Sequence, residues 1–145
     1  LQGNLGSVST AFMAIVQGRI PEKFPGLKTG FIEFGSLWVP DTLHGMHRRG
    51  QMKYRGPVSS LLGAGRTDPQ LFKDYGMFLT CYADEPLPFI LEYVGEENLI
   101  IGSDYSHQDA SEEEDLVQLM RSREDVSPGV VEKILCENAR NFYPL

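Results

Sequence analysis

The stretch from Leu99 to Asp109 holds the residues best suited to chemistry, in the order Leu-Ile-Ile-Gly-Ser-Asp-Tyr-Ser-His-Gln-Asp. It opens with an apolar run that is too short for a helix and typical of a strand covered on both faces. Asp104 follows where that strand should end, which is where α/β folds place their chemistry. Because a buried carboxylate is costly unless it is paired, hydrogen-bonded or bound to a metal, Asp104 is a candidate site residue. The alternative is that Asp104 caps the amides of the following loop.

Three further residues are candidates for substrate binding because of their positions near predicted strand ends. His107 lies in the loop after Asp104 and could bind a substrate carboxylate or act as an acid; otherwise it is a loop residue bonded to backbone. Glu33 lies near the end of another apolar segment, and it is either a site residue or a buried structural carboxylate. Trp38 could line the mouth of a pocket or pack against the next strand and loop.

Two other motifs resemble functional sites but have simpler explanations. His44 and His47 are three residues apart on a predicted helix and could share a metal, yet basic side chains near a helix C-terminus are favoured by the helix dipole. The run Gly63-Ala64-Gly65-Arg66 invites comparison with a phosphate-binding loop. It lacks the preceding strand and the following Lys-Ser/Thr, so no phosphate site is predicted.

The elements that must position these residues alternate along the chain. Strands are predicted over Leu27–Phe34, Met77–Tyr82 and Leu99–Gly102. Helices are predicted over Ser7–Gln17, from near Pro40, from Pro69, from Pro86, from a capping box formed by Ser111 and Glu114, and from Ser127-Pro128. Strands that alternate with helices indicate an α/β fold with a parallel sheet and right-handed crossovers. The alternation does not distinguish an open sheet from part of a barrel.

Composition and charge predict one soluble domain over residues 1–145. The chain is 41% hydrophobic and 23% charged, which is ordinary for a globular protein. Its net charge of −7 argues against nucleic-acid binding, and no apolar run or leader predicts membrane insertion. Cys81 and Cys136 are expected to be free buried thiols of a cytoplasmic protein. The first residue is Leu1 and not Met, so the chain is expected to begin inside a longer gene product.

Four segments, read together, carry a family resemblance. They are Arg19–Lys28, Phe31–Pro40, Gly102–His107 and Ile134–Arg140, and they extend over nearly the whole chain. In this order they resemble the C-terminal half of the amidohydrolase-related family of metal-dependent barrels. That branch includes aminocarboxymuconate-semialdehyde decarboxylase and the resorcylate decarboxylases. The resemblance implies a partial (β/α)8 TIM barrel in which the three predicted strands are strands six, seven and eight.

The resemblance also implies a role for Asp104. In that family the aspartate after strand eight binds the catalytic divalent metal, commonly zinc, and handles the proton of the metal-bound water. Asp104 matches this position, so it is predicted to be both catalytic residue and metal ligand. A divalent metal can lower the pKa of its bound water to about 7, and a neighbouring carboxylate can accept that proton.

Two departures from the family pattern limit this prediction. The decarboxylases carry a histidine at the end of strand six, where this chain has Glu33. The family's other ligands include a His-x-His pair on strand one and a histidine on strand five. The chain has three histidines, at positions 44, 47 and 107, and none forms such a pair. The chain alone is therefore expected to hold no catalytic metal.

The predicted function is a metal-dependent amidohydrolase-type hydrolase or decarboxylase that acts on a small cyclic or aromatic acid, with this chain as the C-terminal half of the barrel. The alternative is a non-catalytic half-barrel that self-associates or binds a partner. Three parallel strands leave two open edges and an apolar inner face. The chain is therefore expected to form a homo-oligomer or to pair with a missing N-terminal half.

Overall fold

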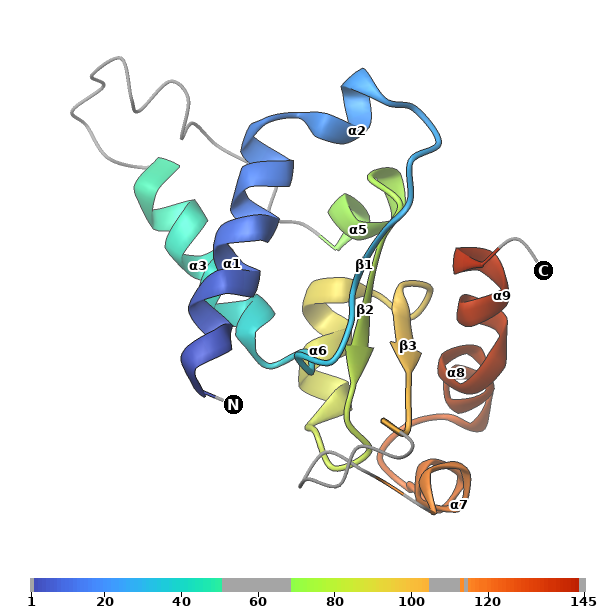
Figure 1. Ribbon diagram of the computed structural model, residues 1–145. Coiled ribbons are helices and arrows are strands. Elements are labelled where there is room, and N and C mark those ends of the chain that lie inside the picture. The colour runs from blue at the N-terminus through green and yellow to red at the C-terminus, as the bar shows by residue number, and fades with distance from the viewer. Residues whose placement is uncertain (1, 51–68, 105–112, 114, 144–145) are drawn as a thin grey trace.

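A three-stranded parallel sheet forms the centre of the computed structural model, which describes residues 2–50, 69–104, 113 and 115–143 (Figure 1). The strands are β1 (Thr29–Phe31), β2 (Met77–Cys81) and β3 (Leu99–Ile101), in the spatial order β1-β2-β3. The predicted α/β class and the three strands are confirmed, although each strand is shorter than predicted. Because the strands are parallel, their carboxyl ends all lie at one edge of the sheet.

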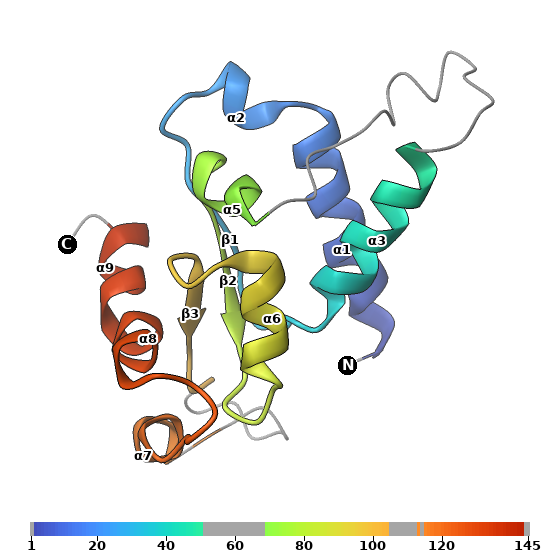
Figure 2. The ribbon, with the colours of Figure 1, turned by 180° about the vertical axis from the view of Figure 1, so that it is seen from behind.

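Helices surround the sheet (Figures 1 and 2). They are α1 (Gln2–Gln17), α2 (Ile20–Lys23), α3 (Trp38–Gly50), α5 (Gln70–Asp74), α6 (Leu87–Val94), α7 (Leu116–Arg121), α8 (Pro128–Glu132), the π-helical turn η1 (Lys133–Glu137) and α9 (Asn138–Phe142). The predicted capping box at Ser111 and Glu114 lies outside the described residues. The predicted helix start at Ser127-Pro128 is confirmed, and the Ser127 hydroxyl caps α8 by accepting a hydrogen bond from the Val130 amide at 3.4 Å.

One face of the sheet packs against the main hydrophobic core. Phe12 of α1 lies at the centre of an aromatic group, with its ring centroid 5.5 to 5.8 Å from those of Phe31, Trp38 and Phe72. The core continues along β2 through Leu79, which is fully buried. This packing fixes α1 and α3 against the sheet and so sets where the loop between β1 and α3 begins.

The opposite face of the sheet is covered in part by the C-terminal helix α9. The ring of Phe142 packs on Phe78 of β2 with centroids 5.1 Å apart. A side chain at Gly30 of β1 would come within 2.7 Å of the Phe142 ring, so glycine is required for this approach. Phe78 and Ile100 are only 6% and 3% exposed. The apolar inner face that the sequence predicts is therefore covered at those two positions.

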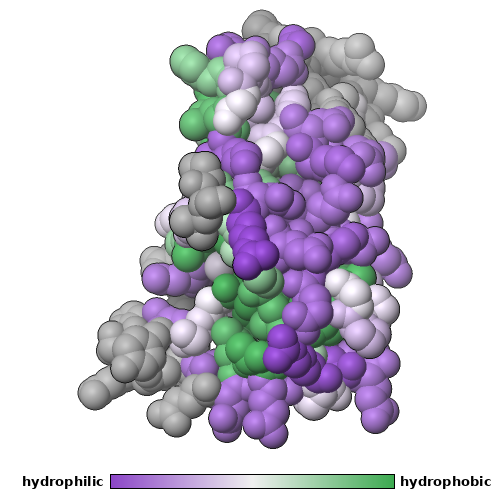
Figure 3. Space-filling view, turned by 90° about the vertical axis from the view of Figure 1, so that its right-hand side faces the viewer, coloured by the Kyte–Doolittle hydropathy of each residue, from purple (hydrophilic) through white to green (hydrophobic). Residues whose placement is uncertain are grey.

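The surface combines acidic character with local apolar areas. Figure 3 shows a largely hydrophilic face on the side of α8 and α9, with apolar residues gathered in its lower part.

Cys81 is buried as predicted, whereas Cys136 is only half-buried. Among the described residues, no helix combines the length and the hydropathy needed to cross a membrane.

Candidate functional site

The candidate residues gather at the carboxyl ends of the three strands. Glu33 comes two residues after β1, Tyr82 directly after β2, and Asp104 three residues after β3. All three line a small pocket of about 130 Å³, together with Ile32, Thr80, Cys81 and Gly102. The parallel sheet therefore brings Glu33 and Asp104, which are far apart in the sequence, to one pocket.

Both carboxylate residues have an unusual backbone conformation. Glu33 has a φ of 68° and Asp104 a φ of 49°, in the left-handed region that non-glycine residues rarely adopt. Such a conformation costs on the order of 1–3 kcal/mol and persists only where the surroundings enforce it. Arg19 is the third such residue in the part of the chain that the structure describes. Strain of this kind is concentrated at functional sites, which supports a site at these strand ends.

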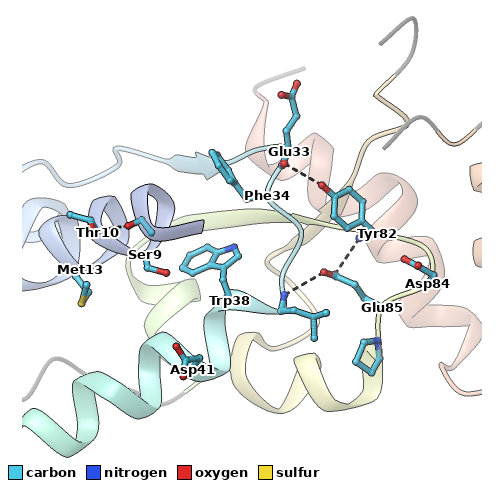
Figure 4. A pocket seen from close by; sticks show the side chains of 13 residues that line it. Ser9, Thr10, Met13, Glu33, Phe34, Trp38, Asp41, Tyr82, Asp84 and Glu85 are labelled. Carbon is cyan, nitrogen blue, oxygen red and sulfur yellow. Dashed lines mark hydrogen bonds between the residues drawn. The ribbon is translucent and has the colours of Figure 1, made fainter. Parts of the chain in front are cut away.

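The main chain of Glu33 is held by two residues of the neighbouring strand and turn. Its amide donates to the Thr80 hydroxyl at 3.0 Å, and its carbonyl accepts from the Tyr82 hydroxyl at 3.2 Å. Glu33 itself is exposed, and Figure 4 shows its carboxylate pointing away from Trp38. The alternative of a buried structural carboxylate is therefore wrong for Glu33, whereas its role in substrate binding stays a prediction.

The buried structural carboxylate of this region is Glu85, which is only 5% exposed. One carboxylate oxygen accepts from the amides of Ser36 and Leu37, at 2.8 and 3.3 Å. The other accepts from the Ser36 hydroxyl and from the Tyr82 amide at 3.2 Å. Sequence reasoning missed Glu85 because acidic residues are common in the turn between a strand and a helix. The usable signal was its position in the short turn that follows β2 and precedes α6.

Trp38 lies at the start of α3 and belongs to the core. It is 6% exposed, and its indole N–H donates to the Gly35 carbonyl at 2.9 Å. Packing in the core therefore accounts for the buried ring of Trp38 and for the hydrogen bond of its indole nitrogen. Part of its side chain also lines a larger pocket, and its contact with a substrate stays a prediction.

That larger pocket, of about 890 Å³, opens between α1, the start of α3 and the loops after β1 and β2 (Figure 4). Its apolar lining comes from Met13, Phe34, Leu37, Trp38 and Pro86, among others. Its acidic lining residues are Glu33, Asp41, Asp84 and Glu85, and no Lys, Arg or His is among its described lining residues. Its size and apolar walls are typical of a small-molecule site. Glu33 lines both pockets and therefore lies between them.

The described residues do not form a metal centre. No group of three or more His, Cys, Asp or Glu side chains within residues 2–50, 69–104, 113 and 115–143 is placed to hold an ion. Catalytic zinc usually has three protein ligands, so Asp104 and its described neighbours do not fit a zinc site. His44 and His47 are exposed on α3, away from the strand ends, and His107 lies outside the described residues.

Comparisons with known proteins bear on the family and on the fold. A family model described as "Amidohydrolase" matches residues 2–145. A crystal structure of an amidohydrolase from Mycobacterium avium subsp. paratuberculosis K-10 is similar to this chain with a TM-score of 0.70 and 18% sequence identity. The similarity covers 90% of this chain and 32% of that one, so this chain spans about a third of its length. No curated protein sequence matches the chain.

Proposed function

Since the chain belongs to the amidohydrolase family, we propose that it forms the C-terminal part of a (β/α)8 barrel in which β1, β2 and β3 are strands six, seven and eight. The fold similarity to about a third of an amidohydrolase supports this assignment. So does the sheet itself, because β1 is an edge strand that pairs only with β2 among the described residues and could pair with a further barrel strand. The chemistry of such barrels lies at the carboxyl ends of the strands, where Glu33 and Asp104 meet.

We propose that the complete protein is a metal-dependent hydrolase or decarboxylase. The observation that carries this proposal is the position of Asp104. It has a strained backbone conformation and lines the same small pocket as Glu33, at the carboxyl ends of the strands. Its carboxylate is suited to accept a proton from a water or a substrate group. A divalent metal, zinc in the family's common case, would need its other ligands from outside the described residues.

The charge of the larger pocket restricts how a substrate could bind. Its described lining residues include Glu33, Asp41 and Asp84 and no cationic side chain. A small aromatic or cyclic acid would therefore place its ring against Phe34 and Leu37 and its own carboxylate elsewhere. His107 remains the candidate partner for that carboxylate.

The test is a pair of carboxylate substitutions in the complete protein. Asp104→Asn removes the proton acceptor but almost no volume, so turnover should fall by about 100-fold or more with the fold intact. Glu33→Gln should reduce turnover less, because Glu33 is proposed only to contact the substrate. Steady-state kinetics and circular dichroism of both variants provide the measurement. Wild-type turnover by Asp104→Asn would refute the catalytic role of Asp104.

The second candidate function is a non-catalytic module that self-associates or binds a missing half of the barrel. The absence of a three-residue metal group among the described residues favours it for this chain alone. The two candidates differ in what Asp104 does: substitution of Asp104 would leave association unchanged in a module but would remove turnover in an enzyme.

A further inference from the structure

The loop after β1 depends on the neighbouring turn for its conformation. Within it, Glu33 and Gly35 both have positive φ, of 68° and 61°. A chain that enters the left-handed region twice within three residues has no regular internal hydrogen bonding to maintain it. The Glu33 amide and carbonyl instead bond to Thr80 and Tyr82, at the end of β2.

The strongest link between the loop and the turn is the carboxylate of Glu85. It accepts from the backbone amides of Ser36 and Leu37 and from the Ser36 hydroxyl, all on the loop after β1. It also accepts from the amide of Tyr82, within its own turn. Four donors therefore converge on one buried carboxylate, and hydrogen bonds to an ionised acceptor are about twice as strong as neutral ones.

The backbone of the loop after β1 passes close to the Glu85 carboxylate. A side-chain carbon at Gly35 would lie 2.6 Å from a carboxylate oxygen of Glu85 and 2.8 Å from the ring of Tyr82. Non-bonded atoms do not come this close, so a side chain at Gly35 would clash with both groups. The loop backbone thus passes directly over the turn, with Glu85 and Tyr82 both in contact with it.

We propose that Glu85 is a positioning residue of the site. Its carboxylate joins the loop that carries Glu33 to the turn that carries Tyr82, so that both side chains stay over the strand ends. Glu85 also lines the larger pocket, but its two oxygens accept from these four donors, so its proposed role is to hold the loop. The functional meaning of this role rests on the proposed function, whereas the clamp itself can be tested without a substrate.

Amide hydrogen exchange of two variants tests the clamp. Glu85→Gln keeps the volume but turns one acceptor oxygen into a donor that faces the loop. The matched control is Asn98→Ala, because Asn98 is also a buried polar residue, 4% exposed, whose side chain donates to the Met77 carbonyl at the opposite edge of the sheet. In Glu85→Gln, the amides of Ser36 and Leu37 should exchange about tenfold faster than in wild type. In Asn98→Ala they should exchange at the wild-type rate.

A second readout uses the single tryptophan of the chain. Trp38 follows the clamped loop directly and bonds to the Gly35 carbonyl, so its fluorescence reports on the loop. Acrylamide should quench Trp38 more strongly in Glu85→Gln than in wild type or Asn98→Ala. A merely structural role would make both variants less stable without this local difference.

Two results would overturn the proposal. One is wild-type exchange of the Ser36 and Leu37 amides in Glu85→Gln; the other is equal acceleration in Asn98→Ala. If Glu85→Gln does not fold, the wild-type protein decides, since the amides of Ser36, Leu37 and Tyr82 should then exchange as slowly as those of β2, and fast exchange would refute the clamp. None of these results depends on turnover, so they stay separate from the test of Asp104.

Discussion

Asp104 and Glu33 come from distant parts of the sequence and share a left-handed backbone conformation, which favours a functional site where they meet. Each follows a strand at the same edge of the sheet, and both line one small pocket. A non-glycine residue in this conformation needs support, and Glu33 receives it from Thr80 and Tyr82. The strained conformation of Glu33 is thus stabilised by the neighbouring strand and not by the loop alone.

The buried thiol of Cys81 should make the free energy of unfolding depend on pH. Burial raises the pKa of Cys81 from 9.0 to about 12, and the charge of Glu85 adds to the shift. Between those two values the unfolded chain has lost a proton that the folded chain keeps. The free energy of unfolding should therefore fall as the pH rises above 9, by up to about 1.4 kcal/mol per pH unit from this thiol.

Urea denaturation at pH values between 8 and 10.5 measures this effect. Cys81→Ala lacks the thiol and should lose the corresponding part of the slope, so the difference between the two proteins isolates Cys81 from lysines and tyrosines. Equal slopes in wild type and Cys81→Ala would show that the thiol is not shielded in the folded state.

The sequence predicted which acidic residues follow a strand better than it predicted whether their side chains are buried. The apolar runs before Glu33 and Asp104 identified both as strand-end residues, because side-chain hydropathy marks buried strands. Nothing in the sequence distinguished the exposed Glu33 from the buried Glu85, since both are acidic residues that follow a predicted strand by a few positions or end it. Their difference arises from which loop donors surround each carboxylate, and those donors come from distant segments.

At the element scale, the predicted strands were correct in place but too long. The strand predicted over Leu27–Phe34 is observed over Thr29–Phe31 alone. The Leu27 amide bonds back to the Phe24 carbonyl in a turn, and the left-handed Glu33 ends the pairing with β2. Side-chain hydropathy indicates which residues are buried. The ends of a strand depend instead on where the partner strand can still form backbone hydrogen bonds.

The loop between β1 and α3 requires a glycine at position 35. Gly35 has a φ of 61°, and an added side chain would meet Glu85 and Tyr82 at 2.6 and 2.8 Å. Gly35→Ala should therefore lower the free energy of unfolding by about 2 kcal/mol or more. Gly45→Ala is the matched control, because Gly45 lies inside α3 and a side chain there would meet nothing closer than 3.9 Å.

Opposite signs are expected for the two glycine substitutions. Alanine is the better helix former, so Gly45→Ala should stabilise the protein by about 0.5–1 kcal/mol. Chemical denaturation of both variants at pH 7 provides the comparison. A Gly35→Ala protein as stable as wild type would show that the loop can move away from Glu85.

For the whole molecule, the two edges of the sheet differ in how the rest of the chain covers them. At β3, the Asn138 side chain of α9 donates to the Leu99 carbonyl at 2.7 Å, so the C-terminal helix covers part of that edge. β1 is the other edge strand and has no pairing partner beyond β2 in the described part of the chain. Exposed apolar residues lie near it, with Phe24, Leu27 and Ile32 exposed by 59%, 48% and 36%. An edge strand with apolar neighbours favours pairing with another chain.

We therefore expect association through β1, with a second copy of the chain or with the missing part of the barrel. Sedimentation equilibrium at micromolar concentration should show a mass above that of the monomer. Ile32→Lys places a charge beside the open edge and should shift the protein toward monomer, since inward or edge lysines oppose strand pairing. Phe89→Lys is the matched control, because Phe89 is 44% exposed on α6, away from β1. It should leave the mass unchanged. A wild-type protein that is monomeric and unfolds cooperatively would mean that this chain closes its own core, and the assignment as part of a larger barrel would then be wrong.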